Sequence, residues 1–363
     1  KMVEWLAGNR IRGTSAERTT TTGFNTVSAA SGGWVELGRS TASGGETSLS
    51  VSSLADKRYY QVITSDHGIA GAPARLWRFN NDSGSNYARR VSSNGAADGT
   101  TTSQTSHNEL SLNDTSQNLS IHYIANYSTK EKLQITHAVG GNSSAASVAP
   151  ARVEFVGKWA NTSDAIDRID YIANSGSFSS GDEVVVLGWD DSDTHTTNFW
   201  EELASVELSC AANSLSTGTF TAKKYLWVQF HIPSSSAANN YNMRVGNATI
   251  DTGSNYSFRY NTNGAADGTA VTQDTIKTSW NGASGSEWAF TNMFIINNSA
   301  NEKLFISHTN RNYTAGAGAA PDRHEVVGKW ANTSSQINII DIYHQTGAAT
   351  LGAGTIMKVW GSD

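Results

Sequence analysis

Cysteine and proline are scarce in this sequence of 363 residues, which contains one cysteine, Cys210, and four prolines. A single cysteine excludes an internal disulfide and a metal site built from several thiolates. Charged residues make up 16% of the chain, the formal net charge is −6 and the isoelectric point is about 5.9. Such a surface does not attract nucleic-acid phosphates or anionic lipids, so we expect neither nucleic acid nor a membrane as a partner.

Long apolar runs and common catalytic motifs are also missing. No apolar run approaches the roughly 18–20 residues that cross a bilayer. The sequence has no Gly-x-Ser-x-Gly elbow, no His-Glu-x-x-His, no Gly-Lys-Ser/Thr phosphate loop and no dinucleotide fingerprint. Carboxylates that could pair as in a glycosidase are Glu154 with Asp170 and Glu325 with Asp341, but any two strands of a β-sandwich offer as much. We therefore predict that the protein is not an enzyme and has no catalytic residue and no cofactor.

What the sequence does contain is a duplication, because VGKWANTS at residues 156–163 returns at residues 327–334. The matching segments around it lie at an offset that grows from 166 residues near the start of the repeat to 173 at its end. Each increase falls in a gap rich in Gly, Ser, Asn and Ala, where loops accept insertions and packed strands do not. The two copies are therefore expected to share one fold.

The duplication predicts the domain boundaries. Residues 34–189 form a first domain and residues 198–363 a second, each within the usual size range and large enough to bury its own core. Residues 190–197 form a linker. Residues 1–33 have no counterpart in the second copy, and they are either a flexible leader or an assembly arm that pairs with a neighbouring subunit.

Short segments with alternating polar and apolar residues, separated by turn residues, dominate both copies. This pattern predicts antiparallel β-sandwiches, jelly-roll-like, with eight to ten strands in each copy and no helix. The clearest segment, residues 225–232, places alternate apolar side chains on a core face and Tyr225 and Trp227 on the other face. The expected strands cover residues 59–63, 75–79, 119–124, 132–136, 152–156, 169–172, 183–189, 225–232, 293–296, 303–306, 337–342 and 357–360.

Several repeated residues have both a structural and a functional interpretation. The octapeptide reads as the end of a strand with a buried Trp159 or Trp330, followed by a turn. The loops at residues 94–100 and 263–269 contain Asn-Gly and Asp-Gly turns, although Asp98 or Asp267 could also bind a cation. The acidic segment 190–197 is expected to be a solvated linker in preference to a Ca²⁺ site. We predict no metal site.

His137 and His308 occupy equivalent positions, in Ile-Thr-His and Ile-Ser-His. We interpret them as packing or hydrogen-bonding residues and not as metal ligands, because we recognise no other possible ligand residue that recurs beside them in both copies.

The sequence resembles virion and tail-associated proteins of tailed bacteriophages, especially marine ones. The resemblance is carried by NRIRGTSAERT in the leader, FTAKKY at residues 220–225, RFNNDSGSNY at residues 78–87, GKWANTS, and the closing VLGW or VWG. It covers almost the whole chain, and it implies jelly-roll-like units in a multicopy, non-enzymatic particle component, in the capsid or tail. It transfers no catalytic residue.

The expected function is therefore that of a virion structural protein in an extracellular particle, a homo-oligomer that also contacts other virion proteins. The alternative is a secreted or cell-surface carbohydrate-binding protein, or a receptor-binding appendage that grips a host-surface glycan. In that case Trp227, Trp280 and Trp288 are the candidate platforms on which a sugar would stack.

Overall fold

The computed structural model describes residues 33–69, 74–109, 116–190, 198–236, 240–279, 288–312, 317–318, 320–345 and 349–363. Within them the chain forms 25 strands and no helix. The described part of the chain contains no helix long and apolar enough to cross a membrane. The fold is all-β, as the alternating pattern predicts. The predicted arm and linker fall on residues 1–32 and 191–197, outside the described residues, with only Gly33 and Asp190 described.

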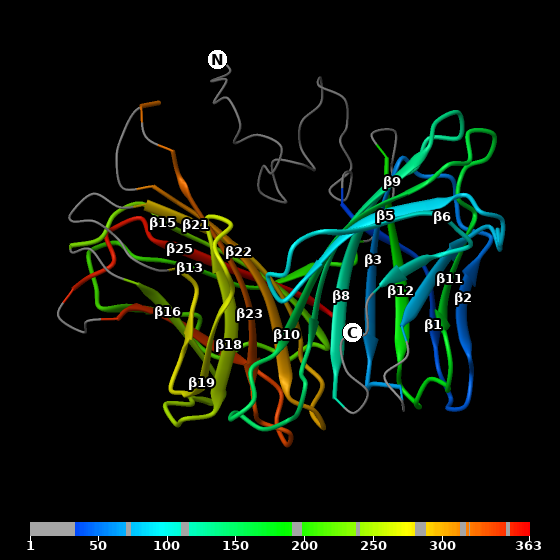
Figure 1. Ribbon diagram of the computed structural model, residues 1–363. Coiled ribbons are helices and arrows are strands. Elements are labelled where there is room, and N and C mark those ends of the chain that lie inside the picture. Colours follow the sequence, from blue (N-terminus) through cyan, green and yellow to red (C-terminus); the bar gives the residue numbers. More distant parts are fainter. Residues whose placement is uncertain are drawn as a thin grey trace, which may run out of the picture.

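The first domain is a sandwich of two antiparallel sheets (Figure 1). Strands from the start and the end of the repeat are neighbours in each sheet, which ties the domain together. The larger sheet has the order β1 (Val35–Thr41), β12 (Glu183–Trp189), β3 (Tyr59–Asp66), β8 (Asn118–Ala125), β9 (Lys132–Gly140), β10 (Ala151–Trp159), β5 (Tyr87–Ser93), β6 (Gly99–Gln104). The smaller sheet has the order β2 (Ser48–Ser52), β11 (Arg168–Ala173), β4 (Arg75–Phe79), β7 (His107–Glu109).

The second domain repeats this topology strand for strand. Its larger sheet has the order β13 (Glu201–Glu207), β25 (Ile356–Ser362), β15 (Tyr225–Ile232), β21 (Trp288–Ile296), β22 (Lys303–Asn312), β23 (Asp322–Trp330), β18 (Tyr256–Thr262), β19 (Gly268–Gln273). Its smaller sheet has the order β14 (Ser214–Ser216), β24 (Ile339–His344), β16 (Tyr241–Asn247), β17 (Thr249–Ile250), and β20 (Ile276–Lys277) pairs with β16. The additional strand β17 lies where the offset between the copies first grows, after residues 79–83 of the first copy.

The predicted tandem sandwiches are confirmed, and every expected strand segment overlaps a strand. The expected number of eight to ten strands per copy is too low, because the copies have 12 and 13 strands within the described residues. The strands that the pattern missed include β5, β16 and β18 inside the sheets, and short or polar strands at the sheet edges. For example, β6 contains no residue with a buried side chain, so no apolar alternation marks it.

Buried tryptophans close both sandwiches at the octapeptide. Trp159 ends β10 with 0% of its surface exposed and Trp330 ends β23 with 2%. Each indole Nε1 donates a hydrogen bond to a carboxylate oxygen, at 2.7 Å to Asp82 and 2.7 Å to Asp251. These contacts confirm the prediction that the octapeptide ends a strand with a buried indole.

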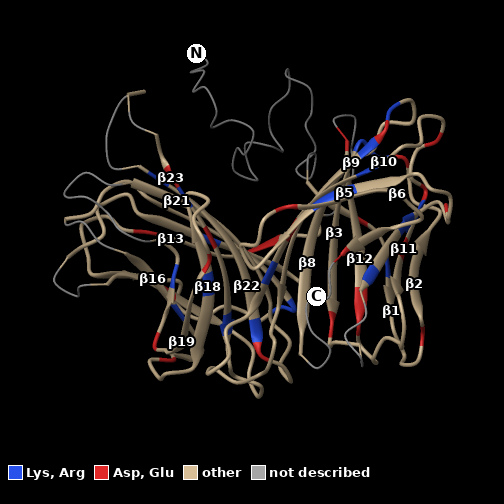
Figure 2. Ribbon diagram, viewed as in Figure 1, with Lys and Arg blue, Asp and Glu red and all other residues tan. Residues whose placement is uncertain are grey.

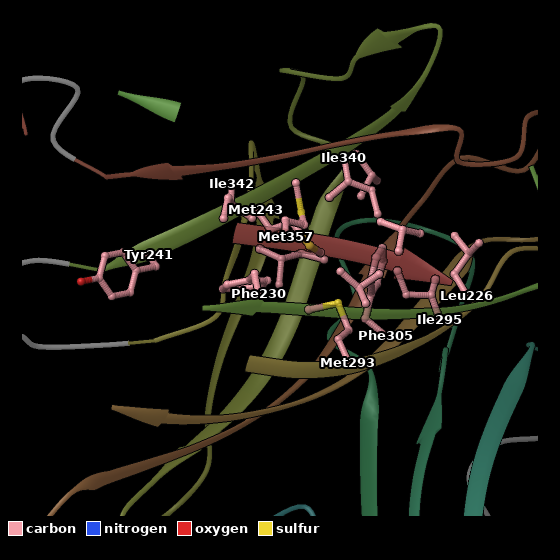
Figure 3. Packing of buried hydrophobic residues seen from close by; sticks show 14 of the residues in the cluster. Leu226, Phe230, Tyr241, Met243, Met293, Ile295, Phe305, Ile340, Ile342 and Met357 are labelled. Atoms are coloured by element: carbon pink, nitrogen blue, oxygen red, sulfur yellow. The ribbon is translucent and has the colours of Figure 1, made fainter. Parts of the chain in front are cut away.

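The two cores differ in polarity. Figure 3 shows the apolar core of the second domain, where Met243, Met293 and Phe305 meet between the sheets. In the first domain the equivalent positions hold Trp77, His122 and Gln134, and the core around them includes a fully buried Glu109. The carboxylate of Glu109 accepts a hydrogen bond from Trp77 Nε1 at 3.0 Å.

The outer faces of the two large sheets pack against each other in the middle of the molecule. The apolar cluster between them takes residues from strands β3, β8, β9 and β12 of the first domain and β15, β21, β22, β23 and β25 of the second. Figure 1 shows the two domains side by side, with the hairpin after β9 reaching toward β18 and β19. Backbone and side-chain hydrogen bonds fix that hairpin, for example Thr272 N to Ala146 O at 2.9 Å and Ser257 Oγ to Val148 O at 3.0 Å. Tyr225, on the outer face of residues 225–232, lies in this cluster, so its covering partner is the first domain.

Candidate functional site at the contact between the domains

Two histidine–glutamate pairs face each other where the domains meet. His137 on β9 lies opposite Glu154 on β10, and His308 on β22 lies opposite Glu325 on β23. Opposite residues of an antiparallel pair point to the same face of a sheet, with Cβ atoms about 4.5–5.5 Å apart. Each domain therefore presents one imidazole and one carboxylate from the outer face of its large sheet.

The imidazoles of the two domains are in ring contact. The centroids of His137 and His308 are 4.3 Å apart, and the ring planes are inclined by 63°. One ligand atom from each of His137, Glu154 and His308 lies within 4.8 Å of the others. These residues line a small cavity that also includes Arg152 and Glu325.

Arg152 connects the site to the second domain by an ion network. Its guanidinium donates hydrogen bonds to Glu154 on its own strand and, across the contact, to Glu325 at 2.8 Å. It also holds both carboxylate oxygens of Asp267, at 2.7 and 3.2 Å. Arg152 is 5% exposed, whereas the side chain of Arg323, its equivalent in the second copy, is 60% exposed.

Burial determines the charge state of the site. Desolvation lowers the pKa of His137 to about 3, and the neighbouring His308 acts in the same direction. Desolvation lowers the pKa of His308 to about 4, with the charge of Arg152 as the second cause. Both rings are therefore neutral at pH 7 and can offer a lone pair. Burial raises the pKa of Glu325, and the negative charge of Glu154 raises it further.

The carboxylates considered for a glycosidase-like pair lie in different sheets. Glu154 lies on β10 of the large sheet, while Asp170 lies on β11 of the small sheet, where Arg168 and Ser50 donate hydrogen bonds to it. Glu325 and Asp341 are separated in the same way, on β23 and β24. The consecutive strands β10 and β11, like β23 and β24, belong to different sheets, so proximity in sequence does not bring these side chains together.

The premise that nothing repeats with the two histidines is wrong. Glu154 and Glu325 repeat with them at the same offset, as do Arg152 and Arg323. The sequence therefore contained a signal for this site, namely three chemically active residue types that recur together in adjacent strands. What the sequence could not show is that the two sets lie against each other.

The loop aspartates have ion-pair partners instead of forming one cation site. Asp267 pairs with Arg152, and Asp98 pairs with Arg90 at 3.5 Å on the exposed side of the first domain. Figure 2 shows acidic and basic residues interspersed over both domains.

Two of the proposed glycan-stacking tryptophans, Trp227 and Trp288, lie far apart. Trp227 on β15 is partly buried in the cluster between the domains. The ring of Phe294 stacks on it with 5.9 Å between the ring centroids, and the ring centroid of Trp360 lies 4.8 Å away. Trp288 is partly exposed at the other end of β21, six residues before Phe294, or roughly 20 Å along the strand. The two indoles therefore do not form one platform. Trp280 lies outside the described residues, and sugar stacking at these positions stays a prediction.

Comparisons with known proteins found similar solved structures only. No protein-family model matches the sequence, and no curated protein matches it. Among solved structures, the chain is similar to domains LG4-5 of the mouse laminin alpha1 chain, at 12% identity, with 90% of each chain covered and a TM-score of 0.19. Another is the Neisserial surface protein A, at 6% identity, with 78% of this chain and 96% of that chain covered and a TM-score of 0.13.

Proposed function

We propose that this chain is a non-enzymatic structural protein that assembles in many copies into a virus particle, through its sandwich faces and the arm of residues 1–33. It would contribute to a capsid surface, a shell, or a tail or fibre, in contact with further copies of itself and with other virion proteins. The observation that supports an assembly role is an apolar patch on the first domain whose counterpart in the second domain is already part of an interface.

The β9–β10 patch consists of Leu133, Ile135 and Val156. These side chains are 56%, 51% and 49% exposed. Ile135 lies directly opposite Val156, and Leu133 follows on the same face of β9. Contiguous exposed apolar side chains of this kind mark interaction sites more often than isolated ones do.

The equivalent residues of the second domain are Leu304, Ile306 and Val327. They are 0%, 3% and 2% exposed, because they pack against the first domain in the cluster between the two large sheets. Both copies therefore carry the same apolar contact face, and among the residues that the structure describes only the second copy has it covered. This asymmetry favours a second chain as the group that covers the β9–β10 patch.

One residue of the surface that covers Leu304, Ile306 and Val327 has an exposed apolar counterpart in the second domain. Leu119 of the first domain lies in the cluster between the domains and is 1% exposed, while its equivalent Phe290 is 46% exposed. A neighbouring chain that repeated the contact between the domains would place Phe290 toward the β9–β10 patch. Repetition of such a head-to-tail contact gives a closed ring or a filament.

Sedimentation velocity and negative-stain electron microscopy of the full chain test this proposal. We expect a large assembly from the unmodified chain, and monomers from a chain carrying Ile135→Lys and Val156→Lys, with unchanged circular dichroism. Val271→Lys is the matched control, because Val271 is 36% exposed on the edge strand β19, outside the patch. A chain that stays monomeric up to its solubility limit would contradict the proposal.

The arm is tested separately by removing residues 1–32. We expect the shortened chain to keep its sandwich fold and to lose long-range order in its assemblies. An assembly of unchanged order after this truncation would show that the sandwich faces act without the arm.

A further inference from the structure

The facing histidine–glutamate pairs have the donor set of a transition-metal site. Two neutral imidazoles and one carboxylate are the ligands that Zn²⁺ takes when it leaves a fourth position for water or another group. Ca²⁺ and Mg²⁺ prefer sites made of oxygen atoms alone, so two imidazoles disfavour them. The donors come from both domains, His137 and Glu154 from the first and His308 from the second.

The site also has free coordinating capacity. Among the described residues, the Nδ1 atom of His137 is buried without a hydrogen-bond partner. A buried polar atom that remains unsatisfied costs free energy, and a bound ion or water is a common explanation for one in a folded protein.

The local charges leave room for one more cation. Arg152 is shared among Glu154, Glu325 and Asp267, and the exposed Arg323 also pairs with Glu325, so two guanidinium groups face three carboxylates. If an ion bound Glu154, Arg152 would keep its hydrogen bonds to Asp267 and Glu325. Glu325, beside His308, is placed to hydrogen-bond a water on the ion or to approach it as a fourth ligand.

The three donor atoms must move slightly closer together to bind one ion. Ligands of a tetrahedral ion with bonds of about 2.0–2.1 Å lie about 3.4 Å apart, and the three donor atoms here are within 4.8 Å of one another. Rotation of the exposed part of Glu154, whose side chain is 27% exposed, can bring its oxygen nearer without moving a strand.

We infer that His137, Glu154 and His308 bind one divalent transition-metal ion, Zn²⁺ above all, and that this ion ties the first domain to the second. Because its ligands come from both domains, such an ion stabilises their packing and not the fold of either domain alone. A metal that binds only the folded chain raises its apparent stability with concentration.

Metal uptake by the full chain tests the inference. The chain is freed of metal with a chelator, supplied with ZnCl₂, passed through a desalting column and analysed by elemental mass spectrometry, and its melting temperature is followed against Zn²⁺ concentration. We expect about one zinc per chain and a melting temperature that rises by several degrees and saturates. In the Co²⁺ form we expect visible absorption bands of a four-coordinate site.

Variants locate the ion. We expect His137→Ala, His308→Ala and Glu154→Gln each to weaken zinc binding at least tenfold and to remove the shift in melting temperature. His231→Ala is the matched control, because His231 is exposed on β15 of the same large sheet as His308, and it should leave both quantities unchanged. His308→Gln, which keeps a polar side chain of similar size, serves if the alanine variants unfold. Zinc bound at less than one-tenth equivalent, or bound equally by the three site variants, overturns the inference.

Discussion

Arg152 of the first domain holds both carboxylate oxygens of Asp267 of the second domain, although 115 residues separate them in the sequence. Bidentate pairs of this kind are among the stronger polar contacts in proteins. The burial of both side chains means that removing one partner leaves the other charge without compensation. The packing of the two domains against each other thus depends strongly on the side chain of Arg152.

Arg152→Ala should lower the free energy of unfolding by about 3–5 kcal/mol, because it leaves the carboxylates of Asp267 and Glu154 without their cation. Glu325 would keep only its contact with the exposed Arg323, at 3.4 Å. Urea unfolding followed by tryptophan fluorescence measures the change. Arg323→Ala is the matched control at the same position of the second copy. Its side chain is 60% exposed, so its effect should stay within about 0.5 kcal/mol. Equal effects of the two substitutions would contradict this interpretation.

A second prediction concerns the buried ion pair in the core of the first domain. Arg75 Nη2 donates to Asp66 at 2.6 Å, and Tyr171 Oη donates to the other oxygen of Asp66 at 2.7 Å. Arg75→Met leaves the Asp66 charge uncompensated and should destabilise the chain by about 3–5 kcal/mol. Thermal unfolding monitored by circular dichroism measures the loss.

The second copy supplies the control for this prediction. There the positions of Asp66, Arg75 and Tyr171 hold Ile232, Tyr241 and Ile342. Introducing these three residues together into the first domain removes the charge along with its partners, so it should cost less than Arg75→Met alone. A triple variant less stable than Arg75→Met would mean that the packing around these positions differs between the domains.

The duplication made most of the fold predictable, but several strands were missed, both inside the sheets and at their edges. An octapeptide with a buried tryptophan and strands such as residues 225–232 carry strong periodic patterns, because one face must be apolar. Strands such as β6, at a sheet edge with no buried side chain, obey no such constraint. Only part of the candidate site could be predicted from the sequence. Glu154 and Glu325 repeat with the histidines, but no local sequence pattern indicates that the two large sheets pack face to face.

A third prediction concerns the tryptophan anchors. Asp82 and Asp251 each accept a 2.7 Å hydrogen bond from the indole of Trp159 or Trp330. Replacing either aspartate with alanine leaves a buried indole N–H unsatisfied, which costs about 1–3 kcal/mol. Because the two contacts match in geometry, the two losses should be similar. Asp98→Ala, at a side chain that is 50% exposed, is the control and should change stability little.

The last prediction is a loss of stability in mild acid. Burial lowers the pKa of His122 and His137 to about 3 and that of His308 to about 4 in the folded chain, from the ordinary 6.5. Between pH 6.5 and pH 4 the unfolded chain therefore binds protons that the folded chain does not, so the free energy of unfolding falls as the pH falls. Each such histidine contributes up to about 1.4 kcal/mol per pH unit within this window.

Asp341 acts in the opposite direction, because burial raises its pKa to about 6 and the folded chain then binds the proton more tightly. The clean measurement is therefore a comparison of variants by urea unfolding at several pH values from 4.5 to 6.5. His308→Gln should reduce the slope by up to about 1.4 kcal/mol per pH unit. A slope that His308→Gln does not alter would mean that His308 titrates alike in the folded and unfolded chains, and its ring would then not be the neutral, buried group that the contact between the domains requires.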